Sequence, residues 1–373
     1  MNERIKILHV CESIVGGTGS YLCELIPHQV AKYGAENVGL LVPENQLAHI
    51  EPQVSAAMPT IFTFKRPGRP LGSLFLVERY LRSIRTFKPD IVHAHSSVAG
   101  VVVRLLAIRR NFGIVFCPHG WSVDMKGARY IKNMTAGVER ALGPIADKTI
   151  VISQYEYDRA AEIGIPMDKV QLVLSGIDPQ VPTIEPAEWN DKRLRVLFAG
   201  RYDYQKGLDV LLKAVEGLED KLSVRIVGGA AVDRIVLPET LPANVADMGW
   251  LDRNGVYAQM KACDVLVIPS RWEGFGLVAI EAMRLAVPVL ASAVGGLKEI
   301  TGNGKYGLVV PPEDPSALRA CLEGLTLDAL RRLGKVGRER FFSCYKSDRM
   351  NRETDEVYAG IVAKAGPICR DAG

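Results

Sequence analysis

The stretch DVLVIPSRWEGFGLVAIEAM, Asp264 to Met283, joins a run of apolar residues to a loop with two glycines and then to a segment of helical spacing. The apolar run at 264–270 is typical of a strand that is buried on both faces of a parallel sheet. From Leu277 onward the apolar residues recur at helical spacing. The stretch therefore predicts a strand, a loop over 271–276 and a helix, which together are part of a βαβ unit.

The same alternation of apolar runs and helical segments covers most of the chain. In the first half the runs lie at 4–10, 37–43, 89–95, 113–119, 148–153 and 169–175, with helices expected at segments such as 20–33 and 74–87. In the second half the runs lie at 194–200, 222–228, 243–249, 264–270, 287–293 and 307–312. This pattern predicts an α/β protein with two Rossmann-like domains that face each other across a cleft.

A polar stretch with three prolines, DPQVPTIEPAEWNDK at 178–192, separates the two series of strands. We place a first domain at 1–180, a linker at 181–192, a second domain at 193–347 and a last helix within 348–373. A chain of 373 residues is long enough to give each of two domains its own core.

The composition is that of an ordinary globular protein, with 48% hydrophobic and 24% charged residues. The 7 cysteines form no CxxC pair, which favours a reducing compartment over a disulfide framework. The apolar run at 98–108 is too short to span a bilayer and contains Arg104. We expect a cytoplasmic protein without a signal peptide or a transmembrane helix, and no nucleic-acid partner.

Two glutamates flank the turn in the opening stretch, Glu273 in the loop and Glu281 in the helix. Gly274 and Gly276 allow the backbone to approach a ligand closely. The unpaired amides at the start of the helix form an anion site suited to phosphate. Glu281 would then accept hydrogen bonds from a ribose, and Glu273 would reach the group beyond the phosphates. The alternative is structural, because an acid near a helix start is favourable for the helix dipole alone.

Two cations follow the first strand of the second half, in LFAGRYDYQKGLDVLL at 197–212. Arg201 and Lys206 would lie at the carboxyl edge of the same sheet, where parallel sheets bind ligands. A forked guanidinium and a compact ammonium could together neutralise a diphosphate. A pair of exposed basic residues without a ligand is the alternative.

The first half has two candidate contacts with a ligand. The amides of the glycine-rich loop around Gly16 and Gly17 could contact a phosphate, although Leu22 replaces the third glycine of the dinucleotide-binding motif. His119 directly follows a strand, and from there it could donate a hydrogen bond to a sugar hydroxyl and to charge on a leaving phosphate. A structural histidine is the alternative explanation for His119.

All 6 histidines lie in the first half of the chain. His93 and His95 belong to one predicted strand, and we assign them to opposite faces of the sheet. Since no carboxylate or cysteine spacing completes a metal site around them, we expect no metal and no cofactor. The reaction, if there is one, would depend on the side chains and on the substrate.

The net charge of +4 is carried by the first half. Residues 1–180 hold 20 Lys and Arg against 16 Asp and Glu, whereas residues 181–373 hold 26 of each kind. The densest part is KRPGRP at 65–70 together with Arg79, Arg82, Arg85 and Lys88, which recur at helical spacing. This part is either a solvated helix face or a surface for anionic lipid or an anionic acceptor.

With these residues in view, nearly the whole chain resembles a retaining glycosyltransferase of the two-Rossmann-domain (GT-B) type. The class is the family 4-like Glu-x7-Glu group, which includes bacterial polysaccharide, mannosyl and sucrose-related transferases. The stretches that carry the resemblance are GGTGSYLCEL, KPDIVHAHSS, HGW, VLSGID, AGRYDYQKGLDVLL, GWL, PSRWEGFGLVAIEAM, VPVLASAVGGLKEI and YGLVVPPED.

The resemblance implies a role for each matching residue. Glu281 would bind the donor ribose, and Arg201 and Lys206 would bind the diphosphate. The remaining implied donor-binding residues are Gly16 and Gly17, the base-lining Gly249, Trp250 and Leu251, and the loop and helix-start residues Gly274, Phe275, Gly276, Leu277 and Val278. Glu273 and His119 would hold the transferred sugar near the reacting carbon, and the last helix would return to the first domain.

The resemblance also implies the reaction. A hexosyl group would pass with retention from a nucleotide-sugar, a UDP-sugar in preference to GDP-mannose, to a hydroxyl of a glycan or lipid-linked acceptor. Such an enzyme would act in bacterial surface polysaccharide biosynthesis, in the cytoplasm or at the inner face of the membrane, without a metal. The alternatives are a nucleotide-sugar epimerase of the same fold and a catalytically silent nucleotide-sugar-binding subunit.

Overall fold

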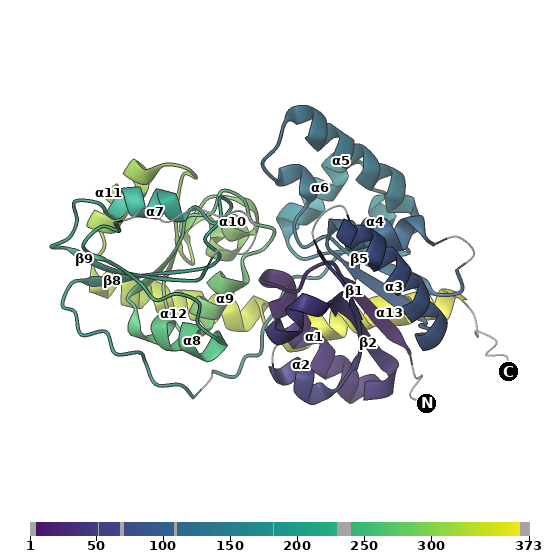
Figure 1. The fold of residues 1–373 in the computed structure, drawn as a ribbon. Helices are drawn as coiled ribbons and strands as arrows, with labels where there is room; N and C mark the ends of the chain where they lie inside the picture. Colours follow the sequence, from purple (N-terminus) through teal and green to yellow (C-terminus); the bar gives the residue numbers. More distant parts are fainter. Residues whose placement is uncertain are drawn as a thin grey trace. The chain divides into compact units, whose positions relative to one another are not determined.

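The computed structural model describes residues 5–50, 52–67, 71–107, 110–181, 183–229 and 240–365, and it divides the chain into two compact units. The first unit contains the residues up to Gly176 and those from Ser347 onward, and the second contains Ile177–Lys346. Each unit is a parallel sheet covered by helices, so the prediction of an α/β protein with two Rossmann-like domains is confirmed (Figure 1).

The first unit is built on a seven-stranded sheet with the order β3-β2-β1-β4-β5-β6-β7, in which every pairing is parallel. The strands are β1 Ile7–Cys11, β2 Val38–Pro43, β3 Thr60–Phe64, β4 Ile91–His95, β5 Gly113–Cys117, β6 Lys148–Val151 and β7 Val170–Leu172. The strand order reverses between β1 and β4, and such switch points are where open α/β sheets bind ligands.

Helices cover both faces of this first sheet. The α-helices are α1 Gly17–Tyr33, α2 Pro52–Ala57, α3 Leu71–Phe87, α4 Ser97–Leu105, α5 Arg129–Leu142, α6 Gln154–Ile163 and α13 Ser347–Ala365. Short 3-10 turns lie at η1 Ala35–Asn37, η2 Glu44–His49, η3 Ser122–Asp124, η4 Gly143–Ile145 and η5 Met167–Lys169.

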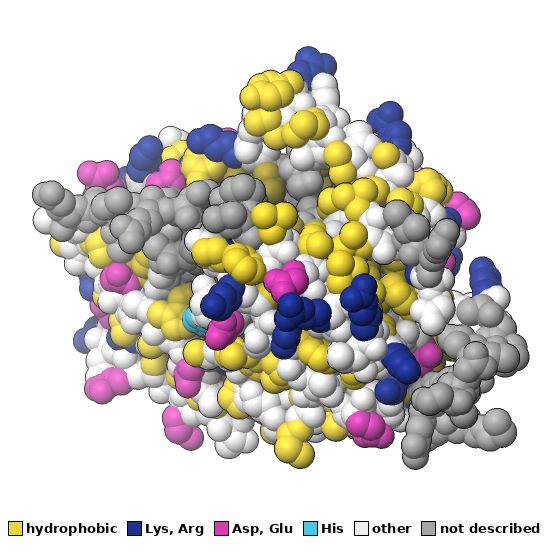
Figure 2. All heavy atoms as spheres, turned by 45° about the vertical axis from the view of Figure 1, so that its right-hand side comes forward, with side chains coloured by type: hydrophobic (Ala, Val, Ile, Leu, Met, Phe, Trp, Pro, Cys, Tyr) yellow, Lys and Arg dark blue, Asp and Glu magenta, His cyan; other side chains and the backbone are white. Residues whose placement is uncertain are grey.

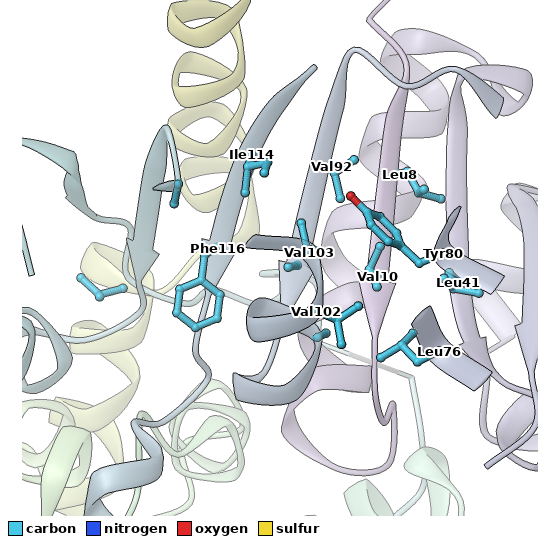
Figure 3. Packing of buried hydrophobic residues seen from close by; sticks show 14 of the residues in the cluster. Leu8, Val10, Leu41, Leu76, Tyr80, Val92, Val102, Val103, Ile114 and Phe116 are labelled. Atoms are coloured by element: carbon cyan, nitrogen blue, oxygen red, sulfur yellow. The ribbon is translucent and has the colours of Figure 1, made fainter. Parts of the chain in front are cut away.

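Apolar packing fixes the two faces of that sheet. On one face Val10 and Val92 pack in one cluster with Tyr80 of α3 and Val103 of α4 (Figure 3). On the other face β2 packs against α1, in a cluster that includes Leu40 and Ile26. Burial of this apolar surface on both sides explains why the strands read as continuous apolar runs.

The second unit has a six-stranded parallel sheet with the order β10-β9-β8-β11-β12-β13. The strands are β8 Leu194–Ala199, β9 Leu222–Val227, β10 Val245–Asp247, β11 Val265–Ile268, β12 Val289–Ser292 and β13 Leu308–Val310. The helices are α7 Leu208–Val215, α8 Arg253–Ala262, α9 Leu277–Arg284, α10 Gly295–Thr301, η6 Gly302–Gly304, α11 Pro315–Glu323 and α12 Leu327–Cys344. Here the order reverses between β8 and β11, so the loops after these strands meet at the switch point.

The stretch expected to be a linker packs on the second unit. Ala187 donates a backbone hydrogen bond to Ala258 (2.9 Å), and the indole of the buried Trp189 donates to Ser223 Oγ (2.9 Å). The chain passes from the first unit to the second at Gly176 and Ile177, before the stretch 181–192. The proline-rich composition therefore marks a covering segment of the second unit rather than the point of exchange.

Two further differences concern single elements. Strand β3 was not expected, because TIFTF at 60–64 is short and lies at the edge of the sheet, where only Phe64 is fully buried. The helix expected at 74–87 begins earlier, at Leu71.

Among the described residues, no helix has both the length and the apolar character that a bilayer-spanning segment needs.

Candidate functional site

The loops at the carboxyl edge of the second sheet hold one another by backbone contacts. Tyr202, after β8, donates its amide hydrogen to Gly229, after β9 (2.9 Å). Gly228 donates in turn to Gly249, after β10 (2.9 Å). A Cβ on Gly207 would lie 2.0 Å from the carbonyl oxygen of Pro269, at the end of β11, so this position has no room for a side chain. The loop cluster therefore forms a close-packed rim at the switch point.

Glu273 and Lys206 are brought together at this rim. Glu273 is buried, and Lys206 Nζ forms an ion pair with its Oε1. Ser270 Oγ donates a hydrogen bond to the same carboxylate oxygen (3.0 Å). Gly295, at φ 46°, has its missing Cβ position only 1.8 Å from the backbone oxygen of Glu273. The start of α10, just after β12, thus packs directly on the backbone of Glu273, and side-chain contacts hold the Glu273 carboxylate.

Arg201 is held on the same loop as Lys206. Arg201 Nε forms an ion pair with Asp203 Oδ2 (2.8 Å), and its Nη2 donates to Gln205 Oε1 (2.9 Å). Gln205 donates to the backbone oxygen of Trp272 (3.0 Å), which ties this loop to the one that carries Glu273. Sequence reasoning missed these partners, because polar residues on separate loops give no periodic signal.

Glu281 belongs to a different group of contacts from Glu273. Helix α9 begins at Leu277, after Gly276 at φ 105°, and no side chain caps its start, so the first amides, including those of Leu277 and Val278, lack a capping side chain. Glu281 is buried one turn further on, where Tyr257 OH donates to Oε1 (3.3 Å). Arg253 Nη2 lies 3.8 Å from that oxygen. The two glutamates therefore have separate surroundings, as two different roles would require.

The loop after β10 presents an aromatic side chain. Gly249 has φ 64°, and its amide donates to Asp247 Oδ1 (2.8 Å). Trp250 is 57% exposed, which is unusual for so large an apolar side chain. Its ring lies 3.6 Å from the position that a Cβ on Gly229 would occupy, so the indole packs beside the loop after β9. An exposed indole at a ligand-binding edge offers a surface on which a base can stack.

The glycine loop of the first unit starts α1 at the switch point of its own sheet. Gly16 is the N-cap residue at φ 89°, and Gly17 is the first residue of the helix. Ile14 donates its amide hydrogen to Gln46 Oε1 (2.9 Å), and a Cβ on Gly19 would lie 2.1 Å from the oxygen of Ile14. The loop is thus held in place by Gln46 of η2, the turn that follows β2. No atom lies within 4 Å of the position where a Cβ on Gly17 would stand.

His119 stands just after β5, in a backbone conformation that is costly for a residue with a side chain. It has φ 52°, and Gly120 follows at φ 104°. The imidazole is partly exposed, and its edge packs on Tyr21, with the ring centroids 4.9 Å apart. Left-handed non-glycine residues cluster at functional sites, where the surrounding structure maintains the strain.

His119 is the outer end of a row of histidines. His95 Nδ1 lies 2.9 Å from His119 Nε2, and His95 Nε2 lies 3.0 Å from His9 Nδ1. His9 Nε2 in turn lies 2.7 Å from Gln29 Oε1. The assignment of His93 and His95 to opposite faces is wrong: residues two apart on a strand share a face, and these ring centroids are 4.1 Å apart.

Burial keeps this row of rings neutral. It lowers the pKa of His9 to about 4 and of His119 to about 3, and it lowers the pKa of His93 and His95 well below the ordinary value of 6.5. Each ring therefore has one N–H group and one lone pair at neutral pH. Sequence reasoning did not group these residues, because they come from β1, β4 and the loop after β5.

The same side chains are the groups of metal-ligand type in the described part of the chain. His9, His93 and His95 form one set, and His95, Cys117 and His119 another, each with donor atoms within 4.8 Å of one another. Direct contacts between the rings already occupy nitrogens of His9, His95 and His119. Burial raises the pKa of the Cys117 thiol well above its usual range.

The basic part of the first unit is divided between two environments. Arg66 pairs with Glu12 (3.2 Å) beside a pocket of about 450 Å³ lined by Glu44, Asn45, Lys65, Arg66, Pro67 and Phe75. Arg82 and Arg85 are exposed on α3, where Arg82 pairs with Glu78 one turn earlier (2.6 Å). The residues at 68–70 of KRPGRP lie outside the described residues.

Comparison with known families matches both units. Residues 15–181 match the family described as Glycosyltransferase Family 4, and residues 182–340 match Glycosyl transferases group 1. The two matches are adjacent and follow the two sheets closely. The chain is a GT-B glycosyltransferase.

This glycosyltransferase is similar over nearly its full length to several proteins. An uncharacterised 41.2 kDa protein in the cps region of Klebsiella pneumoniae is 29% identical, over 95% of this chain and 99% of its own. Sucrose-phosphate synthase from Thermosynechococcus elongatus has a TM-score of 0.82 at 22% identity, over 96% of this chain and 100% of its own. The Anabaena protein HepE in complex with UDP-glucose has a TM-score of 0.77 at 18% identity, over 95% and 100%. At these identities the two structures show a shared fold.

Proposed function

We propose that the protein is a retaining hexosyltransferase that moves a sugar from a UDP-sugar to a hydroxyl of a glycan or lipid-linked acceptor. The observation that carries the proposal is the contact of Lys206 and Ser270 with Glu273, beside the uncapped start of α9. The cluster combines a cation and free amides, which suit a diphosphate, with a carboxylate that suits sugar hydroxyls. GDP-mannose is the second choice of donor.

Each residue has a part in the proposed donor site. Glu281 accepts hydrogen bonds from the ribose, and Trp250, between Gly249 and Leu251, stacks on the base. Arg201, Lys206 and the amides at Leu277 and Val278 bind the diphosphate. Glu273, with the backbone of Gly274, Phe275 and Gly276, holds the sugar. From the first unit, Gly16 and Gly17 contact the phosphates and His119 contacts the sugar.

The proposed chemistry is transfer on one face of the sugar. The acceptor oxygen bonds to the anomeric carbon as the bond from that carbon to the phosphate oxygen breaks, through an oxocarbenium-like transition state. The acceptor proton passes to an oxygen of the leaving diphosphate. Arg201, Lys206 and the helix amides stabilise the charge that develops on that group, so their work is electrostatic.

The proposed site needs no metal, since two cations and a helix start are available for the diphosphate charge. Activity that disappears with a chelator and returns with a divalent ion would overturn this part of the proposal. The UDP-glucose complex of HepE, an 18% identical relative in fold, supports the choice of a uridine nucleotide as the first donor to test.

The proposal is tested first by donor binding. Calorimetry with UDP, GDP, ADP and their common sugar conjugates is expected to identify one nucleotide, with Glu281→Ala weakening the binding of that nucleotide about tenfold or more through loss of charge-assisted hydrogen bonds to the ribose. The anomeric configuration of the product, followed by NMR, then checks retention. Release of an altered sugar without an acceptor would favour an epimerase, and binding without turnover in any acceptor mixture would favour a silent subunit.

The proposed location is the cytoplasm, with peripheral contact to the anionic inner face of the membrane. Arg82 and Arg85 on α3 and Lys88 just after it are exposed, and Leu74 and Phe75 on α3 are 66% and 37% exposed. On the face drawn in Figure 2, Lys and Arg side chains lie among exposed apolar side chains. A basic surface with exposed apolar groups is the combination that binds anionic lipid.

Vesicle binding tests this contact. Each basic residue near an anionic surface contributes about 1 kcal/mol, so Arg82→Glu with Arg85→Glu is expected to weaken binding to vesicles of phosphatidylglycerol and phosphatidylcholine about tenfold or more. Arg331→Glu with Arg332→Glu on α12 is the matched control, with the same change of charge on exposed residues of the second unit. Equal effects of both pairs of substitutions, or no effect of either, would contradict specific membrane binding by this surface of α3.

A further inference from the structure

In the row of His9, His95 and His119, the tautomer of one ring determines the tautomers of the other two. Because each neutral ring has a single N–H group, a ring that donates at one nitrogen must accept at the other. The rings of His9, His95 and His119 contact each other nitrogen to nitrogen, at 3.0 and 2.9 Å. Their order of donation is therefore all in one direction or all in the other.

Gln29 sets that direction at the inner end of the row. Its Oε1, which can only accept, lies 2.7 Å from His9 Nε2, while its Nε2 donates to Tyr358 OH (3.3 Å). His9 therefore donates from Nε2 to Gln29 and accepts at Nδ1. Tyr358 has its own hydroxyl hydrogen left for His93 Nδ1 (2.7 Å), so this amide orientation agrees with both contacts.

The direction then continues along the row. His95 Nε2 donates to His9 Nδ1, and His119 Nε2 donates to His95 Nδ1. His119 is left with a lone pair on Nδ1, and it is the partly exposed ring of the three. Gln29, His9 and His95 are all fully buried, which shields the row from water that could rearrange it.

The position of the His119 ring is also fixed. Its backbone is in the left-handed region at φ 52°, and its ring meets that of His95 edge to edge through the nitrogen contact, with centroids 5.2 Å apart and planes 25° apart. Tyr21 contacts it edge-on from α1. A strained backbone and two ring contacts hold a single ring orientation, which is the arrangement expected of a preorganised ligand contact.

We propose that Gln29, acting through His9 and His95, fixes His119 in the tautomer protonated at Nε2, so that Nδ1 accepts a hydrogen bond from a hydroxyl of the bound sugar. Gln29, His9 and His95 are then positioning residues, and His119 selects for a hydroxyl that can donate. This reverses the donor role that position alone suggested for His119. The identity of the ligand rests on the proposed function, whereas the tautomer does not.

The tautomer is tested by NMR of histidine labelled with ¹⁵N, without any ligand. At pH 7 the neutral form protonated at Nε2 is expected for His9, His95 and His119. Gln29→Met removes the acceptor and is expected to give His119 a mixture of both tautomers. Tyr358→Phe is the matched control, because it removes the hydroxyl beside His93 and Gln29 but leaves the His9 to Gln29 contact. It should leave His119 unchanged.

The ligand contact is tested with monodeoxy and monodeoxyfluoro analogues of the donor found by calorimetry. At the hydroxyl that contacts His119, fluorine cannot donate, so both analogues are expected to bind about threefold to tenfold more weakly than the parent sugar, the loss of one net hydrogen bond. His119→Ala should abolish that difference and leave the affinity for the free nucleotide unchanged.

Each outcome decides one of the two questions. A proton on Nδ1 of His119, a charged His119, or a stoichiometric metal on these rings in the wild-type protein would overturn the inference whatever the substrate is. Full affinity of every deoxyfluoro analogue would overturn the acceptor role. If NMR finds the expected tautomers but no nucleotide-sugar binds, the inference about the tautomers stands and the proposed function is contradicted.

Discussion

Glu273 is buried, and its Oε1 contacts both Lys206 Nζ and Ser270 Oγ. The side chain of Lys206 is 20% exposed, and its ammonium is held by the carboxylate. An ammonium fixed in this way needs little reorganisation when negative charge develops beside it. At the scale of single residues, the proposed donor site depends on this fixed cation.

Replacing Lys206 tests that dependence. Lys206→Met removes a charge from the proposed diphosphate site, and we expect kcat at saturating donor to fall about 10²- to 10³-fold, as for loss of one preorganised stabilising group. Lys213→Met, on the exposed side of α7, is the control for removal of a lysine from the same unit. Similar rates for the two variants would show that Lys206 serves only the structure.

Glu156 is a second buried carboxylate, in the first unit. Its Oε2 accepts from the amide of Ile152 (3.1 Å), and burial raises its pKa from 4.5 to about 7. The folded protein therefore holds a proton that the unfolded chain has lost between these two pH values. Stability from this group falls as pH rises through that window.

Glu156→Gln removes this titration. The melting temperature of the variant relative to the wild type is thus expected to increase from pH 5 to pH 8, as seen by calorimetry across that range. A constant difference over the whole range would mean that Glu156 titrates in the native protein as it does in the unfolded chain.

At the scale of elements, the proposed donor site depends on loops that pack closely on one another, where glycines leave room for the neighbouring backbone. The start of α10, after β12, packs on the Glu273 loop in this way, because a Cβ on Gly295 would overlap the backbone oxygen of Glu273. The loop after β9 is another example, since a Cβ on Gly228 would lie 1.8 Å from the oxygen of Gly200. The position of one loop therefore fixes that of the next along the carboxyl edge.

Gly295→Ala is expected to displace the Glu273 loop and to lower activity more than stability. Gly304→Ala is the matched control, because Gly304 also has a positive φ, 104°, but nothing lies within 4 Å of its missing Cβ. The control should cost about 1–2 kcal/mol of folding free energy, from backbone strain, and leave kcat unchanged. Parallel losses of activity in both variants would contradict a specific role for the contact at Gly295.

The elements could be predicted where one physical signal decides them. Within the described residues, the runs of the second half predicted all six strands of the sheet. The inner strands β11 and β12 are buried throughout, because a sheet covered on both faces requires continuous apolar residues there. The edge strand β3 was missed, since an edge has weaker requirements. A contact such as that of Ser270 with Glu273 is local enough to be predicted from the sequence. The row from Gln29 to His119, in contrast, includes a direct contact between residues 86 positions apart, and no spacing rule reaches that far.

At the scale of the whole molecule, the chain leaves the first unit at Gly176 and returns to it at Ser347. Helix α13 is joined to α1 by Asp355, which accepts from His28 (2.8 Å), Lys32 (2.7 Å) and Tyr33 (2.8 Å). Burial by itself would raise the pKa of Asp355, but these hydrogen bonds lower it. The linker prediction missed this exchange point, because composition records exposure and not the path of the chain.

Asp355→Asn is expected to destabilise the first unit by about 3 kcal/mol at pH 7, because three donors lose a charged partner. As the carboxylate stabilises the fold above its unfolded pKa, this deficit should shrink as pH falls below about 4. Hydrogen exchange of α1 and of β8 would locate the effect, with Glu356→Gln, an exposed neighbour, as the control. Equal protection of α1 in both variants would contradict the role of Asp355.

The return of α13 to the first unit also constrains how the protein is made. Synthesis of the second unit, residues 177–346, separates the two parts of the first unit in time. At 5–20 residues per second, the ribosome needs roughly 10 to 30 seconds to pass through that insert. For that interval the α13-facing surface of the nascent first unit, which includes Gln29 and His93, has no cover. The second unit can complete its own sheet first, although the gene encodes it later.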